Sequence, residues 1–248
     1  MRLLLVNSNT SDFVTDRVAS AARAVAQVST EIVPVTGSFG ARVIATRTEL
    51  AIAEHATIDL LAEHAPGCDA VLIAVSYDVS LWAAREMLRI PVVGITEAAL
   101  LTACMLGTRI GVVVFGRRVL PIYQERVAGY GLSSRIAGWR AIESSAPYAA
   151  GDQSEADALT IAAANDLVER DGAEVIVLTG AVMAGVPPRL QPNVPVPLLD
   201  GISCGVRQAE ALAALAPVKS SVGSLAPLPA REMVRVSPAI AQRFTSSH

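Results

Sequence analysis

Short apolar runs alternate with segments of helical spacing along almost the whole chain, and this alternation limits the folds available to it. Repeated strand–helix units of this kind predict an α/β fold with mainly parallel sheets covered by helices. Hydrophobic residues make up 52% of the 248 residues, whereas aromatic residues make up only 4%. We therefore expect a large core built from Val, Leu, Ile and Ala, as buried parallel strands prefer.

The alternation gives specific ranges for the elements. The expected strands are Leu3–Val6, Glu31–Val35, Ala70–Val75, Val92–Ile95, Ile110–Phe115, Ile136–Ile142, Val175–Leu178 and Val196–Leu199. The expected helices are Phe13–Ala26, Glu49–Glu63, Leu81–Leu88, Ala98–Leu106, Val119–Gly129, Glu155–Glu169 and Val206–Leu215.

The chain also contains an internal repeat. Asp69–Ser76 and Glu174–Ala181 share a pattern 105 positions apart, and Leu3–Asn7 is similar to Val112–Gly116. We expect two similar lobes: a first lobe of residues 1–97 together with part of 196–216, and a second lobe of residues 98–195. Residues 217–248 are rich in Pro and Ser and are expected to form a tail that follows the surface or is partly disordered.

Charge, hydropathy and cysteine content exclude several classes of protein. Twenty basic and 23 acidic residues give a net charge of −3, without the basic excess of nucleic-acid-binding proteins. The longest weakly polar run, Ala98–Gly107, is about half the length of a membrane-spanning helix. Cys68, Cys104 and Cys204 are three isolated cysteines without metal-ligand spacing. We expect reduced thiols in a cytoplasmic protein that binds neither membranes nor nucleic acid.

Polar and small residues follow three of the expected strands, where open α/β sheets bind ligands. Asn7-Ser8-Asn9-Thr10-Ser11 offers more hydrogen-bonding groups than helix capping by Ser11 would need. Ser76 and Tyr77 offer hydroxyl donors, whereas Asp78 or Ser80 is expected to cap the helix that follows. The small residues of Thr179–Gly185 allow backbone N–H groups to approach a ligand closely.

One further motif has the spacing of a nucleophile elbow. Gly201-Ile202-Ser203-Cys204-Gly205 lies between an expected strand and an expected helix, as G-x-S-x-G does in α/β hydrolases. The catalytic histidine should follow it, but the one later histidine is the terminal His248. We therefore interpret the motif as structural. For Cys204, we favour the role of a small buried residue over that of a nucleophile.

Several loops resemble, in the right order, motifs of the aspartate/glutamate/hydantoin racemase superfamily. Leu4–Ser11 is close to a motif ending in N-P-N-T-S, with Ser8 in place of proline, and Ile73–Asp78 matches I-A-C-x-x-D. Val92–Ala98 is similar to P-V-x-G-I-x-E-A, and Val177–Gly185 to V-L-G-C-A-G-M-A-G. The resemblance covers roughly residues 1–217 and implies a cofactor-independent enzyme with two similar α/β lobes.

The resemblance also implies a remodelled site. Racemases of this superfamily use two cysteines, one from each lobe, and those positions fall on Val75 and Gly180, which cannot exchange a proton. A Thr-Thr pair of the family is replaced by Val114 and Phe115. The expected substrate-binding residues are Asn7, Thr10, Val75, Val114, Phe115, Thr179, Gly180 and Ala181.

Three functions are compatible with this pattern. The first is an isomerase or lyase that stabilises a carbanion or enolate of a small carboxylate, imide or hydantoin-like substrate, with Ser76 and Tyr77 as catalytic residues. The second is a hydrolase that uses Ser76 or Tyr77 on a small cyclic or amide substrate. The third is a binding protein for small molecules. We expect no cofactor, no metal and a homo-oligomer.

Overall fold

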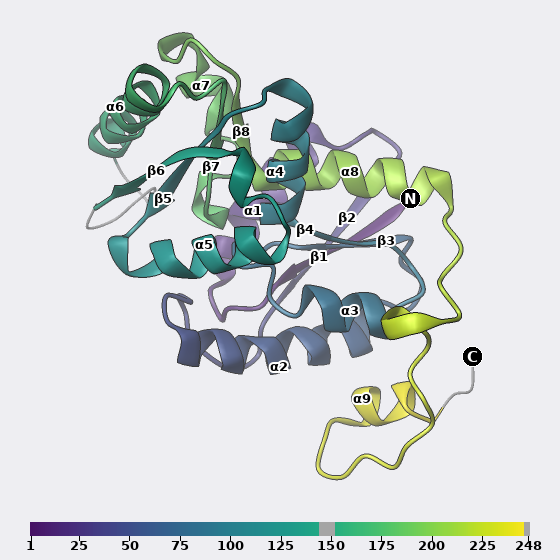
Figure 1. The fold of residues 1–248 in the computed structure, drawn as a ribbon. Helices are drawn as coiled ribbons and strands as arrows, with labels where there is room; N and C mark the ends of the chain where they lie inside the picture. Colours follow the sequence, from purple (N-terminus) through teal and green to yellow (C-terminus); the bar gives the residue numbers. More distant parts are fainter. Residues whose placement is uncertain (144–151, 246–248) are drawn as a thin grey trace.

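Two four-stranded parallel sheets form the centre of the molecule (Figure 1). The computed structural model describes residues 1–143 and 152–245. The strand order is β2-β1-β3-β4 in the first sheet and β6-β5-β7-β8 in the second. The two orders are the same when each strand number of the first sheet is raised by four. This confirms the expected α/β class with two similar parallel-sheet units.

The strands match the expected apolar runs closely. They are β1 (Arg2–Asn7), β2 (Glu31–Thr36), β3 (Ala70–Ile73), β4 (Val92–Gly94), β5 (Ile110–Phe115), β6 (Ile136–Ile142), β7 (Val175–Leu178) and β8 (Leu198–Asp200). Leu3 pairs with Ala70 and Ile110 pairs with Val175, so Ile110 is the counterpart of Leu3. The expected match of Leu3 with Val112 was therefore wrong by two residues, because alternating apolar strands look alike when shifted by one period.

Helices connect successive strands and cover the sheets. They are α1 (Asp12–Val25), α2 (Arg47–His64), α3 (Leu81–Met87), α4 (Ile95–Leu106), α5 (Leu120–Gly129), α6 (Ser154–Asp171), α7 (Pro187–Leu190), α8 (Gly201–Leu215) and α9 (Pro238–Arg243). None of the helices in the described ranges is long and apolar enough to cross a membrane.

The first sheet is covered on both faces, which explains why its strands are apolar on both sides. Helices α2 and α3 lie below it in Figure 1, and α1 and α8 lie above it. Helix α8 comes very close to β3, since a Cβ atom added at Gly205 would lie 2.5 Å from Leu72 Cδ1. Helix α4 packs against α8 and against strands of the second sheet, so this helix pair joins the two sheets.

The starts of two helices differ most from the sequence pattern, since both lie at least three residues earlier than predicted. Helix α4 was expected from Ala98 and begins at Ile95, and α8 was expected from Val206 and begins at Gly201. Both starts are stabilised by a carboxylate that accepts backbone N–H groups of the first turn, Asp78 for α4 and Asp200 for α8. The expected β3 was also too long, because the chain turns after Ala74, the last residue of this segment to bond to β1.

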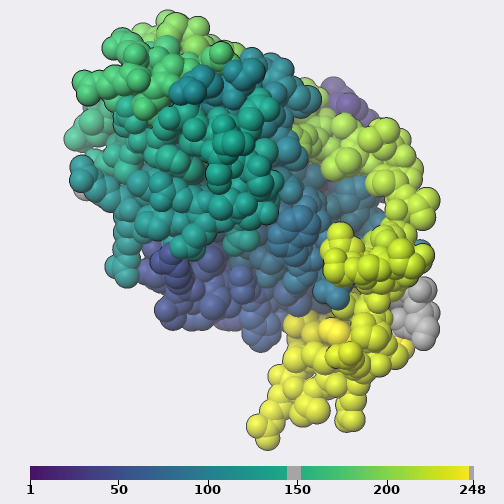
Figure 2. Space-filling view, viewed as in Figure 1, coloured from purple at the N-terminus to yellow at the C-terminus, as the bar shows by residue number. Residues whose placement is uncertain are grey.

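The segment from residue 217 onward first packs against α3, where the Lys219 ammonium donates to the Arg85 carbonyl, and then forms the yellow projection in Figure 2. It is held to α2 by two contacts: the Ser237 hydroxyl bonds to Asp59 at 2.5 Å, and Arg243 donates to the Ala62 carbonyl at 2.9 Å. Residues 217–245 therefore contact α2 and α3, and residues 246–248 lie outside the described residues.

Replacing Leu72 tests how far the fold depends on the aliphatic centre of the first sheet. Leu72 is fully buried in β3, so Leu72→Ala should lower the free energy of unfolding by about 2–5 kcal/mol, because it leaves a cavity. Urea unfolding followed by circular dichroism measures this loss. Leu215→Ala is the control, since Leu215 is 74% exposed and should change stability by about 0.5 kcal/mol or less. Equal losses would contradict this packing.

Candidate active site

A cavity of about 200 Å³ opens between the carboxyl ends of the strands of both sheets. Loops from the ends of β1, β3, β5 and β7 contribute to its lining. The lining residues are Asn9, Val14, Arg42, Val43, Ile44, Ala45, Ala74, Val75, Ser76, Tyr77, Phe115, Val119, Tyr123, Thr179, Gly180, Ala181 and Val182. The three loops that the sequence singled out therefore meet at one site, as the shared edge of parallel strands requires.

Ser76 joins the two halves of the cavity. Its hydroxyl oxygen accepts a hydrogen bond of 3.0 Å from the backbone N–H of Ala181, a residue 105 positions later. That separation equals the repeat offset, so equivalent positions of the two lobes touch each other. The Ser76 carbonyl in turn accepts a hydrogen bond from the Thr96 hydroxyl, which fixes the loop on its other side.

Two tyrosines and one phenylalanine are the aromatic residues among the described lining of the cavity. The Tyr77 ring, which is 5% exposed, lies 5.0 Å from the Tyr123 ring of α5. Burial raises the pKa of the Tyr77 phenol far above its usual value. Burial also raises the pKa of Tyr123, to about 12, although the nearby Ser76 and Thr179 hydroxyls oppose this rise. Both phenols therefore remain protonated at neutral pH and can donate hydrogen bonds.

Several backbone N–H groups in the lining have no acceptor among the residues that the structure describes. Within the described ranges, the amides of Ser76, Tyr77, Gly180 and Val182 donate to no other group. Gly180 has a φ of +102°, a conformation that side chains rarely adopt, and this shapes the turn after β7. Because unpaired backbone donors are uncommon in protein interiors, such a cluster is suited to bind the oxygens of an anion.

The loop after β1 contributes through Asn9 rather than through Asn7 or Thr10. The Asn7 amide is fully buried and donates to Asn9 Oδ1 at 2.9 Å and Thr15 Oγ1 at 2.9 Å. Thr10 lies outside the lining, and its backbone N–H donates to the Ala41 carbonyl at 3.1 Å. Asn7 thus organises the loop, and Ser11 makes no side-chain capping bond to α1.

The other expected site residues divide by strand geometry. Val75, Phe115, Thr179, Gly180 and Ala181 all line the cavity. Val114 does not, because successive residues of β5 point to opposite faces and Val114 faces the core. The Thr179 hydroxyl donates to the Val113 carbonyl at 3.0 Å, which leaves its oxygen free to accept from a neighbour.

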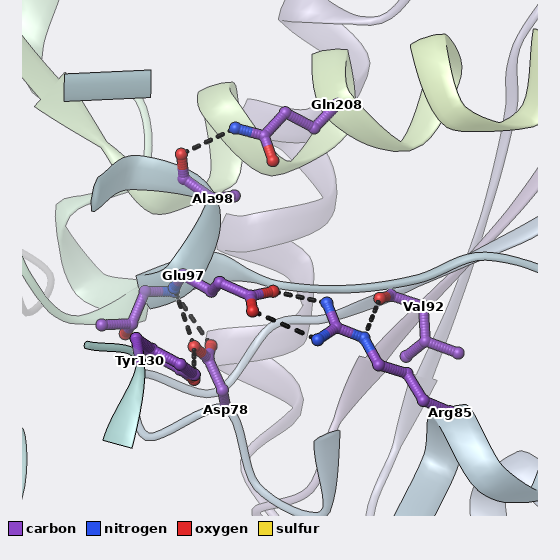
Figure 3. A network of polar contacts seen from close by, with 8 residues as sticks. Asp78, Arg85, Val92, Glu97, Ala98, Tyr130 and Gln208 are labelled. Atoms are coloured by element: carbon purple, nitrogen blue, oxygen red, sulfur yellow. Dashed lines mark hydrogen bonds and ion pairs between the residues drawn. The ribbon is translucent and has the colours of Figure 1, made fainter. Parts of the chain in front are cut away.

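Asp78 caps a helix, but not the one that follows it in sequence. Its two carboxylate oxygens accept the backbone N–H groups of Thr96 at 2.9 Å and Glu97 at 2.8 Å, at the start of α4 (Figure 3). The Tyr130 hydroxyl of α5 donates to the same carboxylate at 2.6 Å. Burial raises the pKa of Asp78 to about 6, and these three donors oppose the rise.

The same network continues to α3. Glu97 forms a two-point ion pair with Arg85, whose third bond goes to the Val92 carbonyl at 3.1 Å (Figure 3). Ser80, the other expected cap, instead donates to the Glu54 carbonyl of α2 at 3.0 Å. The loop after β3 is therefore fastened to α2, α4 and α5, which holds Ser76 and Tyr77 at the cavity.

The nucleophile-elbow motif is part of a helix start. The Ser203 hydroxyl donates to the Asp200 carboxylate at 2.6 Å, and Cys204 is buried one residue further along α8. Burial raises the pKa of the Cys204 thiol to about 11, so it is not a thiolate at neutral pH. His248 lies outside the described residues. Among those that are described, no group of three or more His, Cys, Asp or Glu is placed to hold a metal ion.

Sequence reasoning missed Tyr123, Arg42 and the neighbouring residues 43–45. Tyr123 lies within a helix, and only the packing of α5 against the loop after β3 brings it to the cavity, beside the Tyr77 ring. Residues 42–45 come from the connection between β2 and α2, which carries no recognisable motif. Asn9 was also absent from the expected binding residues, but it lies in the loop after β1, which the sequence analysis did single out as part of the site.

Comparison with known proteins identifies relatives that span most of the chain. A family model described as Asp/Glu/Hydantoin racemase matches residues 3–209. A hydantoin racemase from Paenarthrobacter aurescens is 33% identical over 217 residues, which cover 87% of this chain and 92% of that protein. A hydantoin racemase from Pseudomonas sp. (strain NS671) is 30% identical over 213 residues, 86% of each chain.

Solved structures agree with the sequence comparison. An allantoin racemase from Klebsiella pneumoniae superposes with a TM-score of 0.88 at 31% identity, covering 98% of both chains. An arylmalonate decarboxylase has a TM-score of 0.61 at 16% identity over 86% of this chain and 92% of that chain, a likeness of fold alone.

The buried Asp78 carboxyl predicts an unusual pH dependence of stability. Its folded pKa of about 6 lies above the usual value of 3.8, so the folded state holds the proton more tightly. The stability advantage of the wild type over Asp78→Asn should therefore shrink as the pH rises from about 4 to about 6 and stay constant above. Urea unfolding across this range measures the difference. Tyr130→Phe should extend the decline to higher pH, and an advantage that grows with pH would contradict the prediction.

Proposed function

Because this chain belongs to the Asp/Glu/hydantoin racemase family, we propose that it is a cofactor-independent enzyme acting beside a carbonyl group. Its substrate is a small carboxylate, imide or hydantoin-like molecule bound in the cavity between the sheets. The site stabilises the carbanion or enolate form of that substrate. It does not use the two-cysteine proton exchange of racemases, since the resemblance of its loops assigns Val75 and Gly180 to the positions of the family's cysteines.

The observation that carries the proposal is the set of donors that meet at Ser76. The Ser76 hydroxyl, the Tyr77 and Tyr123 phenols and the unpaired amides of Gly180 and Val182 surround one small cavity. Donors that are already in place when negative charge develops on an oxygen lower the barrier without reorganisation. A volume of about 200 Å³ suits a small substrate rather than a drug-sized ligand.

Tyr77 is the proposed proton donor. A phenol holds its proton at neutral pH but gives it to the far more basic carbon of an enolate. Ser76 accepts the Ala181 N–H, and its hydroxyl hydrogen, which lies near the Tyr123 oxygen, turns to the substrate oxygen when the substrate binds. Tyr123, which lies beside both, supplies a further hydrogen bond and keeps the Tyr77 ring in place.

Between an isomerase and a lyase, the residues that line the cavity favour a lyase. Among the described residues that line the cavity there is no Asp, Glu, His, Cys or Lys, so no side chain accepts a proton at neutral pH. Loss of a carboxylate as CO₂ needs no base, because the electron pair of the broken C–C bond forms the enolate directly. Tyr77 then protonates the carbon, and water restores the phenol proton.

The same lining argues against a hydrolase. Serine and tyrosine hydroxyls are weak nucleophiles unless a neighbouring base removes their proton. Ser76 has no such neighbour within the described part of the lining, and its oxygen is already an acceptor for Ala181. We therefore assign Ser76 to binding of the developing anion rather than to attack on the substrate.

Removing either hydroxyl should impair turnover. Loss of one placed donor typically costs about 10²–10³ in rate, so we expect Ser76→Ala and Tyr77→Phe to lower kcat at least about tenfold. The Tm should fall by only a few degrees, as for one lost hydrogen bond. Steady-state kinetics with scanning calorimetry tests both statements. Cys204→Ala is the control and should remain near wild type. Full activity of both hydroxyl variants would place the site elsewhere.

Cysteine-type racemisation should be absent. In D₂O, neither L-Asp, L-Glu nor a 5-substituted hydantoin should exchange its α-hydrogen or lose optical rotation, because no thiol lies at Val75 or Gly180. Proton NMR and polarimetry follow both processes. Rapid deuterium incorporation without release of CO₂ would show that a base is present and would contradict the absence of racemisation.

A further inference from the structure

Arg42 brings a formal positive charge to the cavity. Of the described residues that line the cavity, Arg42 alone is charged, and no carboxylate accompanies it. Its side chain is exposed and forms no hydrogen bond or ion pair with the residues that the structure describes. Its neighbours Val43 and Ile44 also line the cavity and are apolar. An arginine without a partner at the entrance of an apolar cavity attracts an anion.

The segment that carries Arg42 is held in place on both sides. The Ala41 carbonyl accepts the Thr10 N–H at 3.1 Å, and the Ala45 N–H donates to the Glu49 carboxylate at 2.8 Å. The Glu49 carboxylate therefore already has a backbone partner, and the Ala45 N–H lowers the pKa of this carboxyl group. The Thr46 hydroxyl, which accepts the Glu49 N–H at 3.2 Å, lowers the same pKa.

A second cation adds to the positive potential of this region. Arg118 directly precedes Val119, which lines the cavity, and its charge acts on Glu49 from the second lobe. Arg118 is exposed and makes no ion pair with any described residue. Cations from both lobes therefore lie near the cavity, and the nearby carboxylate of Glu49 is already occupied by backbone donors.

From these contacts we infer that Arg42 binds an anionic substituent of the substrate and so determines its class. The substrate is a small carbonyl compound that carries a carboxylate on the part facing the cavity entrance. The carbonyl group lies deeper, at the donors around Ser76. Because guanidinium pairs with carboxylate through two parallel hydrogen bonds, Arg42 would fix orientation as well as add affinity. This inference rests on the proposed function, which places the substrate in this cavity.

Two probes of nearly equal shape test the role of Arg42. Hydantoin-5-acetate carries the carboxylate, and its primary amide is the neutral counterpart. Isothermal titration calorimetry should show the wild-type protein binding the acid at least about tenfold more tightly than the amide, the range of a hydrogen bond to a charged group. Arg42→Gln should abolish this preference, whereas Arg42→Lys should keep part of it. Added salt should weaken the preference, since Arg42 is exposed.

The controls separate this inference from the proposed function. Arg23→Gln removes an exposed charge near the far end of α1 and should leave the preference unchanged. Ser76→Ala should weaken the binding of the acid and of the amide by the same factor. Equal binding of acid and amide by the wild type, no binding of the acid, or a preference that survives in Arg42→Gln would overturn the role of Arg42 alone. Binding of both probes that responds to neither Ser76 nor Arg42 would overturn the proposed function as well.

Discussion

The parallel pairing of the strands is the constraint on which the rest of the structure depends. Parallel strands end at a common edge, so every loop that follows a strand is brought to the same side of its sheet. The two sheets have the same strand order and face each other through these edges. The bond between Ala181 and Ser76 joins equivalent positions of the two units. A cavity between repeats is therefore a consequence of topology, and the residues at the strand ends decide its chemistry.

One buried carboxylate fixes the loop that carries Ser76 and Tyr77. An ionised group in the interior is costly, and the elevated pKa of Asp78 records that cost. Two backbone N–H groups of α4 and the Tyr130 hydroxyl compensate for it. A Cβ atom added at Gly94 would lie 2.4 Å from Asp78 Cγ, so glycine is required where β4 meets the capping side chain. The cap thus links the loop after β3 to α4 and α5, which pack around the cavity.

The chemical character of the cavity follows from what it contains. Its polar groups are mainly hydroxyls and backbone amides, which donate hydrogen bonds at neutral pH, and its walls are valine, isoleucine, alanine and phenylalanine. Low polarity strengthens the interaction of each donor with a developing charge. The absence of Asp, Glu, His, Cys and Lys from the described lining is consistent with chemistry in which the electron pair comes from a bond other than C–H. The position of Arg42 at this lining adds selectivity for an anion without adding a base.

The sequence by itself determined the fold class, most strand positions and the loops that carry Ser76, Tyr77 and Thr179, because these depend on local patterns: apolar runs, helical spacing and the residues just after each strand. Its resemblance to the racemases also led us to assign Val75 and Gly180 to the positions of the two family cysteines. Tertiary structure alone decided that Asp78 caps α4, that Asn9 and not Asn7 lines the cavity, and that Tyr123 and Arg42 reach it. The physical reason is distance along the chain: Asp78 bonds to amides 18 and 19 residues away, and α5 packs against the loop after β3 through contacts that no local pattern encodes.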